Sequence, residues 1–490
     1  MSKKKISIIG SGVSSLAAAA FLAKAGHEVD VFEKNSGPGG RARSYEAEGF
    51  RFDMGPSWFW MPDVFERFYN NFNLNMNKEL KLERLDPSYK VYFDLQNGEN
   101  IPAGLDAMCT YVESIEEGAG VKFLKFMKQA EQNYNIAVKD VIYQPGASPL
   151  ELVNRKTISR LPLFFKSIQK QIHSTFKSER LRQLLCFPVL FLGARPQDMP
   201  AFYNFMNHAD TVLGTWYPEG GFYAVIQSMV KLCMGMNVKF HYNAEISAIH
   251  CENNSVKSIE TTEKNFETDI VLSGADYAHT EQLLPKQYRK YTDEYWSKRQ
   301  FAPSSLIFYL GINTKLPDLK HHNLFFDTDF DKHTNEIYKT PKWPESPLFY
   351  VCNPSKTDPH VAPEGSENVF VLIPLAAGLE DSDTLREELY EQVMTRLEKS
   401  CSSDIRSHIV YKRSYCLNDF IEDYHACKGN AYGLANTFTQ TAFLRPPLKS
   451  SKLNNMFFCG QLSVPGPGVP PSLISGELSA QLINDQIKFS

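Results

Sequence analysis

The first 33 residues constrain the fold most, because they place a glycine turn and a helix-like stretch between two strand-like segments. Residues 5–9 are mostly apolar and lead directly into Gly10-Ser11-Gly12, and an alanine-rich stretch continues from there to Gly26. Alanine favours helix, and a glycine after such a stretch suits a C-terminal cap. Residues 27–33 alternate polar and apolar side chains, as a strand does. The segment therefore predicts a β-α-β unit and an α/β fold.

The glycines of this unit stand where a nucleotide phosphate needs them. Gly10 permits a tight turn, Gly12 lets the backbone approach a pyrophosphate, and the following helix N-terminus favours negative charge. Glu33 lies 23 positions after Gly10, where a carboxylate accepts hydrogen bonds from ribose hydroxyls and repels the 2′-phosphate of NADP. The third glycine position holds Ser15, next to Ser14, a departure from the strict motif. A turn without a ligand is the alternative, and the context favours nucleotide binding.

Two further glycine turns follow the second predicted strand. Gly39, Gly40 and Arg41 come shortly after Lys34, and the segment Gly55-Pro56-Ser57 comes later. Adjacent glycines allow close backbone approach, and the arginine can reach a phosphate or the edge of a flavin ring. An enzyme that binds NAD needs only the first turn. In this combination the sequence resembles the amine-oxidase-like flavoprotein superfamily, which implies FAD as the cofactor.

The C-terminal segment contains a turn rich in glycine and proline. A strand-like run ends at Gly460, and the turn leads into a helical pattern that we expect to begin near Pro471, because proline is favoured in a first helical turn. In the superfamily that this chain resembles, the last helix points its N-terminus at the flavin pyrimidine. Its dipole would stabilise a reduced, anionic ring. A rigid surface loop is the alternative.

Three separated motifs resemble those of the bacterial-type carotenoid desaturases, namely residues 216–221, 429–446 and 457–476. They stand at the middle and the end of the chain, so with the N-terminal turns the resemblance covers most of it. The resemblance and the glycine turns together predict one set of cofactor-binding residues. These are Gly10, Gly12, Ser14, Ser15, Glu33, Lys34, Gly39, Gly40, Arg41, Gly55, Pro56, Ser57, Gly460, Gly468, Val469, Pro470 and Ser472.

The same resemblance implies a cofactor domain that is discontinuous in sequence. We expect a Rossmann-like FAD-binding domain from residues 1–75, 216–285 and 420–490, in agreement with strand and helix patterns at 222–232, 238–242, 245–250, 255–260 and 269–272. Residues 76–114 and 286–419 would form a mixed α+β substrate domain, with strands at 91–93 and 305–310. Residues 115–215 would form a helical lid that faces a membrane.

Composition excludes several classes of protein. The formal net charge is −4, so the whole chain lacks the basic excess of a nucleic-acid-binding protein. Nine cysteines without a CxxC pair favour mostly reduced, buried thiols in the cytosol. About 18 consecutive apolar residues, which a membrane-spanning helix needs, occur nowhere. We therefore expect a cytoplasmic protein, peripherally associated with the inner face of the cytoplasmic membrane.

A basic segment within the helical region is the candidate for membrane contact. Residues 152–182 carry eight Lys and Arg residues against the single acid Glu179. Apolar residues interleave with them, a pattern that suits anionic lipid headgroups and the acyl boundary. A basic helical lid with one buried face is the alternative. A carotenoid substrate favours the membrane interpretation, because such a substrate has almost no polar handle and partitions into lipid.

The family resemblance implies removal of two hydrogens from adjacent carbons of a long isoprenoid chain, with the hydride passing to flavin N5. Phytoene-type multistep desaturation and 3,4-desaturation of an acyclic or monocyclic, hydroxylated carotenoid both fit, and oxygen or a quinone would reoxidise the flavin. A redox-neutral, FAD-dependent carotenoid cis–trans isomerase is the alternative enzyme. A flavin-binding scaffold without activity is the alternative outside enzymes, and nothing indicates the aromatic cage of an amine oxidase.

No residue stands out as the proton acceptor of such a reaction. Glu219 and Asp53 are weak catalytic candidates, because each stands beside a predicted cofactor turn. Glu219 suits turn capping equally well, and for Asp53 we favour a role in fixing the loop of the cofactor motif. No set of residues has metal-ligand spacing. The adjacent His321 and His322 have poor chelating geometry on a strand, and we expect a solvated pair.

Overall fold

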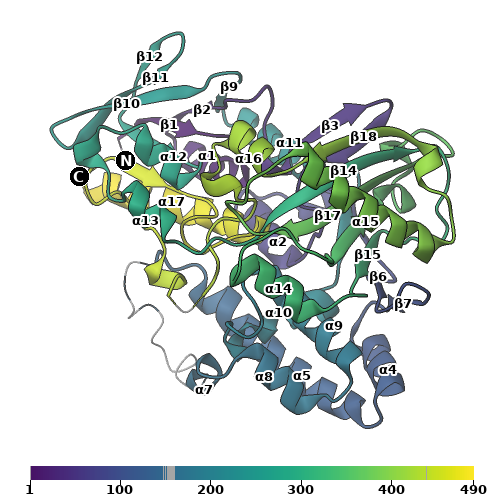
Figure 1. Cartoon of the computed structure of the whole chain (residues 1–490). Coiled ribbons are helices and arrows are strands. Elements are labelled where there is room, and N and C mark those ends of the chain that lie inside the picture. Colours follow the sequence, from purple (N-terminus) through teal and green to yellow (C-terminus); the bar gives the residue numbers. More distant parts are fainter. Residues whose placement is uncertain (1, 147, 149–150, 152–159, 438, 490) are drawn as a thin grey trace.

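The computed structural model describes residues 2–146, 148, 151, 160–437 and 439–489. Its first sheet is the parallel sheet that the N-terminus predicts, and it draws strands from three distant parts of the chain (Figure 1). The strand order is β19 (Met456–Phe458), β13 (Ile270–Ser273), β1 (Lys5–Ile9), β2 (Glu28–Phe32) and β9 (Lys239–His241). Ile6 pairs with Ile270 on one side and with Val29 on the other. The two ends of the chain thus share one sheet.

The first and last helices pack closely against each other beside this sheet. These helices are α1 (Val13–Lys24) and α17 (Val469–Phe489), and α11 (Phe222–Gly235) also contacts α1. The contact depends on Gly476, because a Cβ there would lie 2.2 Å from the carbonyl oxygen of Ser14. Any side chain at this position would force the helices apart. The two chain termini lie on the same side of the molecule (Figure 1).

A second sheet of seven mostly antiparallel strands forms beside the first. Its order is β18 (Ile409–Tyr415), β14 (Ser304–Ile312), β17 (Glu367–Leu375), β16 (Phe349–Cys352), β15 (His322–Phe325), β6 (Tyr89–Tyr92) and β7 (Gly98–Ile101). Only the β15–β6 pair within it is parallel. The helix α15 (Asp383–Cys401) contributes Leu389, Val393 and Leu397 to a separate buried cluster with the central strands. The predicted strands at 91–93 and 305–310 are confirmed within one or two residues at each end.

The described residues between 105 and 213 are mostly helical, in line with the helical region that the sequence predicts for residues 115–215, and lie below the two sheets in Figure 1. Its α-helices are α4 (Leu105–Ile115), α5 (Ala119–Tyr134), α7 (Leu161–Phe164), α8 (Ile168–Thr175), α9 (Glu179–Leu190) and α10 (Phe205–His208). π-helical segments run over Asn135–Val141 and Ala209–Leu213. Residues 152–159 of the predicted basic segment lie outside the described residues.

The remaining elements connect these layers. The strands are β3 (Ser44–Ala47), β4 (Phe50–Asp53), β5 (Leu82–Arg84), β8 (Trp216–Pro218), β10 (Ile246–Glu252), β11 (Ser255–Thr261) and β12 (Asn265–Glu267). The helices are α2 (Pro62–Asn70), α3 (Met76–Glu79), α12 (Tyr277–Gln282), α13 (Asp293–Ser297), α14 (Phe330–Tyr338) and α16 (Leu417–Tyr424). All nine cysteines are free thiols, and six of them are buried. Within the described residues, none of the helices combines the length and the apolar character that crossing a bilayer requires.

Candidate functional site

The first two glycine turns touch at the end of the parallel sheet. Gly12 and Gly39 form an isolated β-bridge, and the amide of Gly39 donates to the carbonyl of Ser11 at 2.9 Å. A Cβ on Gly12 would meet nothing within 4 Å, so the backbone there presents a bare face. Gly12 also caps α1 without a side-chain hydrogen bond, which leaves the first-turn amides of the helix for a ligand. The arrangement fits a phosphate-binding cradle.

Glu33 is held rigidly at the end of β2. Its side chain is 6% exposed, and Oε2 accepts hydrogen bonds from the Ser11 amide at 2.9 Å and the Ser11 hydroxyl at 2.7 Å. Oε1 accepts from the Asn35 amide at 2.8 Å. Lys34, the next residue, points its ammonium to the carbonyl of Glu422 instead. The carboxylate therefore lies directly beside the first glycine turn, to which Ser11 ties it.

Arg41 lies across the second glycine turn. Its Nη2 donates to the Asn430 carbonyl at 3.0 Å, and the guanidinium lies 5.0 Å from the centre of the Tyr424 ring. Its Nε is buried and has no partner among the described residues. Burial lowers the pKa of the guanidinium, with Asp276 opposing the shift. An arginine with a spare donor beside two glycine turns fits the negative charge and polar edge of a dinucleotide.

The C-terminal turn ends at α17 as the sequence predicts, two residues earlier than expected. Gly468 has φ +111°, a conformation that favours glycine, and the helix begins at Val469. Pro470 and Pro471 supply no N–H in the first turn, and the Ser472 amide donates to the Gly468 carbonyl at 3.0 Å. Gly460 is fixed separately, through its amide, to the hydroxyl of Ser475 at 2.9 Å. The turn thus presents the dipole of a helix whose first residues are rigid.

Arg445 holds this turn from behind. The residue is 3% exposed and donates five hydrogen bonds, all to uncharged oxygens. The acceptors are the carbonyls of Leu434, Gln440, Gln461 and Ser463 and the side chain of Asn436. Burial lowers its pKa to about 10, so the side chain stays charged at neutral pH. No carboxylate forms an ion pair with it among the residues that the structure describes.

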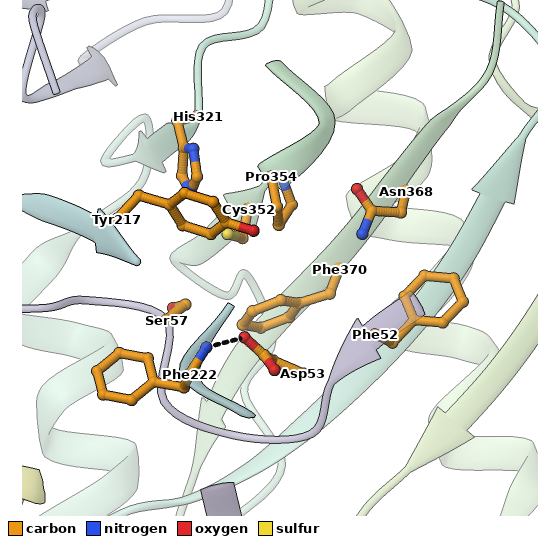
Figure 2. Close-up of a pocket in the computed structure, with 10 residues that line it drawn as sticks. All are labelled: Phe52, Asp53, Ser57, Tyr217, Phe222, His321, Cys352, Pro354, Asn368 and Phe370. Carbon is orange, nitrogen blue, oxygen red and sulfur yellow. Dashed lines mark hydrogen bonds between the residues drawn. The ribbon is translucent and has the colours of Figure 1, made fainter. Parts of the chain in front are cut away.

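A buried polar pocket lies next to the Gly55-Pro56-Ser57 turn (Figure 2). Its lining residues come from β4, β8, α11, β16, β17 and the connecting segments beside them; they are Phe52, Asp53, Ser57, Tyr217, Phe222, His321, Cys352, Pro354, Asn368 and Phe370. The carboxylate of Asp53 accepts hydrogen bonds from the amides of Phe222 at 2.6 Å and Tyr223 at 3.3 Å. It therefore caps the N-terminus of α11. Burial raises the pKa of Asp53 to about 7.

The prediction of a solvated His321–His322 pair is wrong. The two residues are 5% and 0% exposed, because the ring of His321 packs against Tyr217 at 4.7 Å and that of His322, in the inner strand β15, stacks on Trp58 at 4.0 Å. His321 Nδ1 lies 2.7 Å from the Thr357 hydroxyl, and His322 Nδ1 lies 2.6 Å from the Tyr350 hydroxyl. Burial lowers the pKa of His321 to about 3, and it also holds the pKa of His322 well below its usual value. Both rings are therefore neutral.

These histidines also have a third neighbour that local sequence does not reveal. Cys352 pairs with His322 across β15 and β16, and ligand atoms of His321, His322 and Cys352 lie within 4.8 Å of one another. Their spacing is close enough for the three side chains to hold a metal ion together. Burial raises the pKa of the Cys352 thiol to about 12.

Glu219, the other acid that the sequence singles out, lies half exposed at the surface. It forms an ion pair with Lys81 at 3.2 Å. It lines an open groove with residues of β5 and the 357–360 segment. Glu219 therefore faces solvent, whereas Asp53 lies in the buried pocket.

Sequence reasoning missed a further buried acid, Asp210, in the π-helical turn after α10. It is 6% exposed, and its Oδ2 accepts a hydrogen bond from the Tyr89 hydroxyl at 2.9 Å. Its Oδ1 is buried without a partner among the described residues. Burial raises the pKa of Asp210 to about 7. The available signal was a lone acid in a helix-like segment a few residues before the 216–221 motif.

Comparison with known proteins matches this chain over nearly its whole length. The family described as flavin containing amine oxidoreductase matches residues 14–484. A carotenoid 3,4-desaturase of Haloarcula japonica is 38% identical, with 99% of each chain covered. A zeta-carotene-forming phytoene desaturase of Myxococcus xanthus is 31% identical over 97% of this chain and 93% of its own length.

Solved structures share the fold at much lower identity. An oxidoreductase from Methanosarcina mazei has a TM-score of 0.64 at 18% identity, with 96% of this chain and 99% of that chain covered. Wild-type putrescine oxidase bound to putrescine has a TM-score of 0.61 at 13% identity, with 99% of both chains covered. At these identities the likeness supports the fold alone.

Proposed function

We propose that this chain, a member of the flavin containing amine oxidoreductase family, is an FAD-dependent desaturase of carotenoids. Membership makes it an oxidoreductase with FAD as its cofactor. The observation that carries the substrate class is the 38% identity to a carotenoid 3,4-desaturase along 99% of both chains. Relatives at 31% identity, which are named as phytoene-type desaturases, act on the same chemical class.

The N-terminal site residues suit the adenosine and pyrophosphate part of FAD, and the C-terminal ones suit the flavin ring. Gly12, Gly39 and the N-terminus of α1 would hold the pyrophosphate, and Glu33 would accept hydrogen bonds from the adenosine ribose. The helix dipole of α17, with the turn that Arg445 holds, would stabilise negative charge on the ring. When bound, oxidised FAD supplies an acceptor for the hydride that leaves the substrate carbon. Oxygen or a quinone would then take the electrons.

We assign the parts of the chain to roles in the same way. Residues 1–75, 216–285 and 420–490 would form the FAD-binding domain, and residues 76–114 and 286–419 the substrate domain. Residues 115–215 would form the lid. The support is that the strands of the parallel sheet come only from the first group, and those of the seven-stranded sheet only from the second.

Between the two versions of desaturation we favour the 3,4-reaction near the end of an acyclic or monocyclic, hydroxylated carotenoid. The support is the higher identity, 38% against 31%, to the relative that bears that name. A multistep enzyme would have to move its substrate along the site after each new double bond. A 3,4-desaturase acts at one place near the chain end.

The decisive experiment supplies purified, FAD-loaded protein with carotenoids in liposomes. One arm contains a 1-hydroxylated acyclic carotenoid and the other contains phytoene, and both include oxygen or a quinone. We expect a product two mass units lighter, with absorption shifted to the red, in the hydroxylated arm. If the enzyme converted phytoene and not the hydroxylated carotenoid, phytoene-type desaturation would replace 3,4-desaturation as the proposed reaction. A product of unchanged mass but altered geometry would identify an isomerase, and no turnover in either arm would leave a flavin-binding scaffold.

We further propose that the helical region meets the membrane. Large apolar side chains are exposed at Val121 (62%), Leu161 (52%) and Phe165 (83%), on α5 and at the two ends of α7. The basic residues Arg160 and Lys166 flank the α7 pair in sequence. Exposed aromatic and aliphatic groups beside cations suit an anionic lipid surface. A peripheral position would let the enzyme take its substrate directly from the bilayer.

Removing the apolar groups should weaken lipid binding. We expect the double substitution Leu161→Ser with Phe165→Ser to lower the partition coefficient into anionic vesicles by at least about 100-fold, because the two groups together contribute at least about 3 kcal/mol when buried in an apolar environment. Cosedimentation with vesicles measures it. Val410→Ser, at a similarly exposed residue of β18, is the matched control. Equal partition of the double variant and the wild type would contradict membrane contact through α7.

A further inference from the structure

Asp210 is a buried acid with one oxygen that the fold does not use. It lies in the π-helical turn Ala209–Leu213, an arrangement often found at functional sites. Tyr89 fixes Oδ2 through a 2.9 Å hydrogen bond, whereas Oδ1 is buried without a partner among the described residues. Buried polar atoms are nearly always paired, so an unpaired carboxylate oxygen requires an explanation. A ligand or substrate contact supplies one.

The surroundings of Asp210 connect it to the expected cofactor loop. Its partner Tyr89 belongs to an aromatic cluster whose ring centroids lie 5.4 Å (Tyr89–Trp58), 5.7 Å (Tyr89–Phe187) and 5.5 Å (Trp58–Phe187) apart. Trp58 directly follows Ser57 of the third glycine turn. Aromatic faces of this kind suit a long conjugated hydrocarbon. Asp210 thus stands one hydrogen bond away from a buried aromatic cluster beside the expected cofactor loop.

The other buried acid near the expected cofactor loop is already engaged. Both oxygens of Asp53 accept backbone amides at the start of α11. A Cβ on Gly221 would lie 2.3 Å from Asp53 Oδ2, which shows how tightly the carboxylate is enclosed on that side. Asp53 therefore serves as a helix cap. Asp210 keeps an oxygen that pairs with none of the described residues, and the two acids differ in this respect although burial raises the pKa of each to about 7.

We propose that Asp210 Oδ1 accepts the proton that leaves the substrate during desaturation, a role that rests on the proposed carotenoid desaturase function. One carbon of the substrate loses a hydrogen with its electron pair as a hydride, which oxidised FAD accepts. The adjacent carbon loses a proton to Asp210, and the electron pair of that C–H bond becomes the new π bond. Two hydrogens leave, one double bond forms, and the carboxylate becomes a carboxylic acid.

The protonation behaviour of Asp210 suits this task. Burial raises its pKa to about 7, so a substantial fraction of the group is ionised at neutral pH and binds a proton readily. The efficiency of a general base is greatest when its pKa lies near the working pH. Tyr89 donates to one oxygen only and thereby fixes the direction of the other.

The test compares Asp210→Asn with the wild type in the liposome assay. We expect unchanged FAD content and an unchanged KM for the carotenoid, but a kcat lower by about 10²- to 10⁴-fold, the usual contribution of a general base. Glu281→Gln is the matched control, since Glu281 is also a buried acid whose pKa is raised to about 7. It belongs to α12 and hydrogen-bonds the amides of Lys290 and Tyr291.

A second variant separates a chemical role from a structural one. Asp210→Ala should be equally inactive, and added formate should restore part of its kcat by placing a carboxylate in the vacated space. Wild-type turnover by Asp210→Asn would overturn the assignment, and so would an Asp210→Ala enzyme that formate leaves unchanged. If the wild type converted no carotenoid, the proposed function would fail and the assignment with it. A variant that lost FAD as well would indicate a structural role instead.

Discussion

Replacing Gly12 by aspartate is expected to give a folded protein that purifies without flavin. A Cβ at this position meets no protein atom within 4 Å, and Gly12 has φ −70°, which any residue adopts. Aspartate is also a preferred N-cap, so α1 should not be destabilised. The new carboxylate would, however, occupy the bare face of the cradle and repel the pyrophosphate. We expect FAD affinity to fall at least about 100-fold, or about 2.7 kcal/mol.

The measurements are the flavin-to-protein absorbance ratio and FAD titration of the apoprotein by fluorescence. Thermal unfolding of the apoprotein verifies that the fold is intact. Gly235→Ala, at the end of α11 where a Cβ also meets nothing within 4 Å, is the control and should keep its flavin. An aspartate variant that retained the flavin content of the wild type would place the pyrophosphate elsewhere.

Replacing Arg445 by methionine should produce the largest loss of stability among the variants considered. Methionine fills similar space but makes none of the five hydrogen bonds that hold the C-terminal turn. Each buried acceptor left unpaired costs about 1 kcal/mol or more. Part of this loss is offset, because a charge that no carboxylate neutralises is no longer buried. We expect the free energy of unfolding to fall by about 4 kcal/mol.

Urea denaturation followed by tryptophan fluorescence measures this change. Arg51→Met is the matched control, because the Arg51 side chain forms an exposed ion pair with Glu46 at 3.2 Å. Such pairs contribute about 1 kcal/mol or less. A methionine variant at position 445 that unfolded at the urea concentration of the control would mean that the turn does not depend on the guanidinium.

Local sequence patterns predicted those parts of the molecule in which the interacting residues lie close together in the sequence. The glycine turn, the alanine-rich helix and Glu33 all lie within 33 residues, so their spacing alone indicates the β-α-β unit. The same holds for the glycine–proline turn before α17. In these segments hydrophobic period and turn chemistry agree with the final fold.

The rest depends on partners that lie far away in sequence. His321 and His322 are polar, and packing against Tyr217 and Trp58 from distant segments buries them. Cys352 reaches His322 through strand register, which no local pattern encodes. Asp210 accepts its hydrogen bond from Tyr89, 121 positions earlier. Sequence spacing does not show which side chains are buried. Burial is what distinguishes Asp210 from the half-exposed Glu219.

The order of the strands in the parallel sheet also has a consequence for how the protein is made. β19 completes the sheet beside β13, and α17 packs on α1 through Gly476 near the very end of the chain. A ribosome must therefore release the chain at least as far as α17 before the N-terminal unit finds these partners. Contacts between such remote segments form slowly. The nascent N-terminal unit would wait with an unfinished sheet edge, and the coenzyme would be captured only after α17 has emerged.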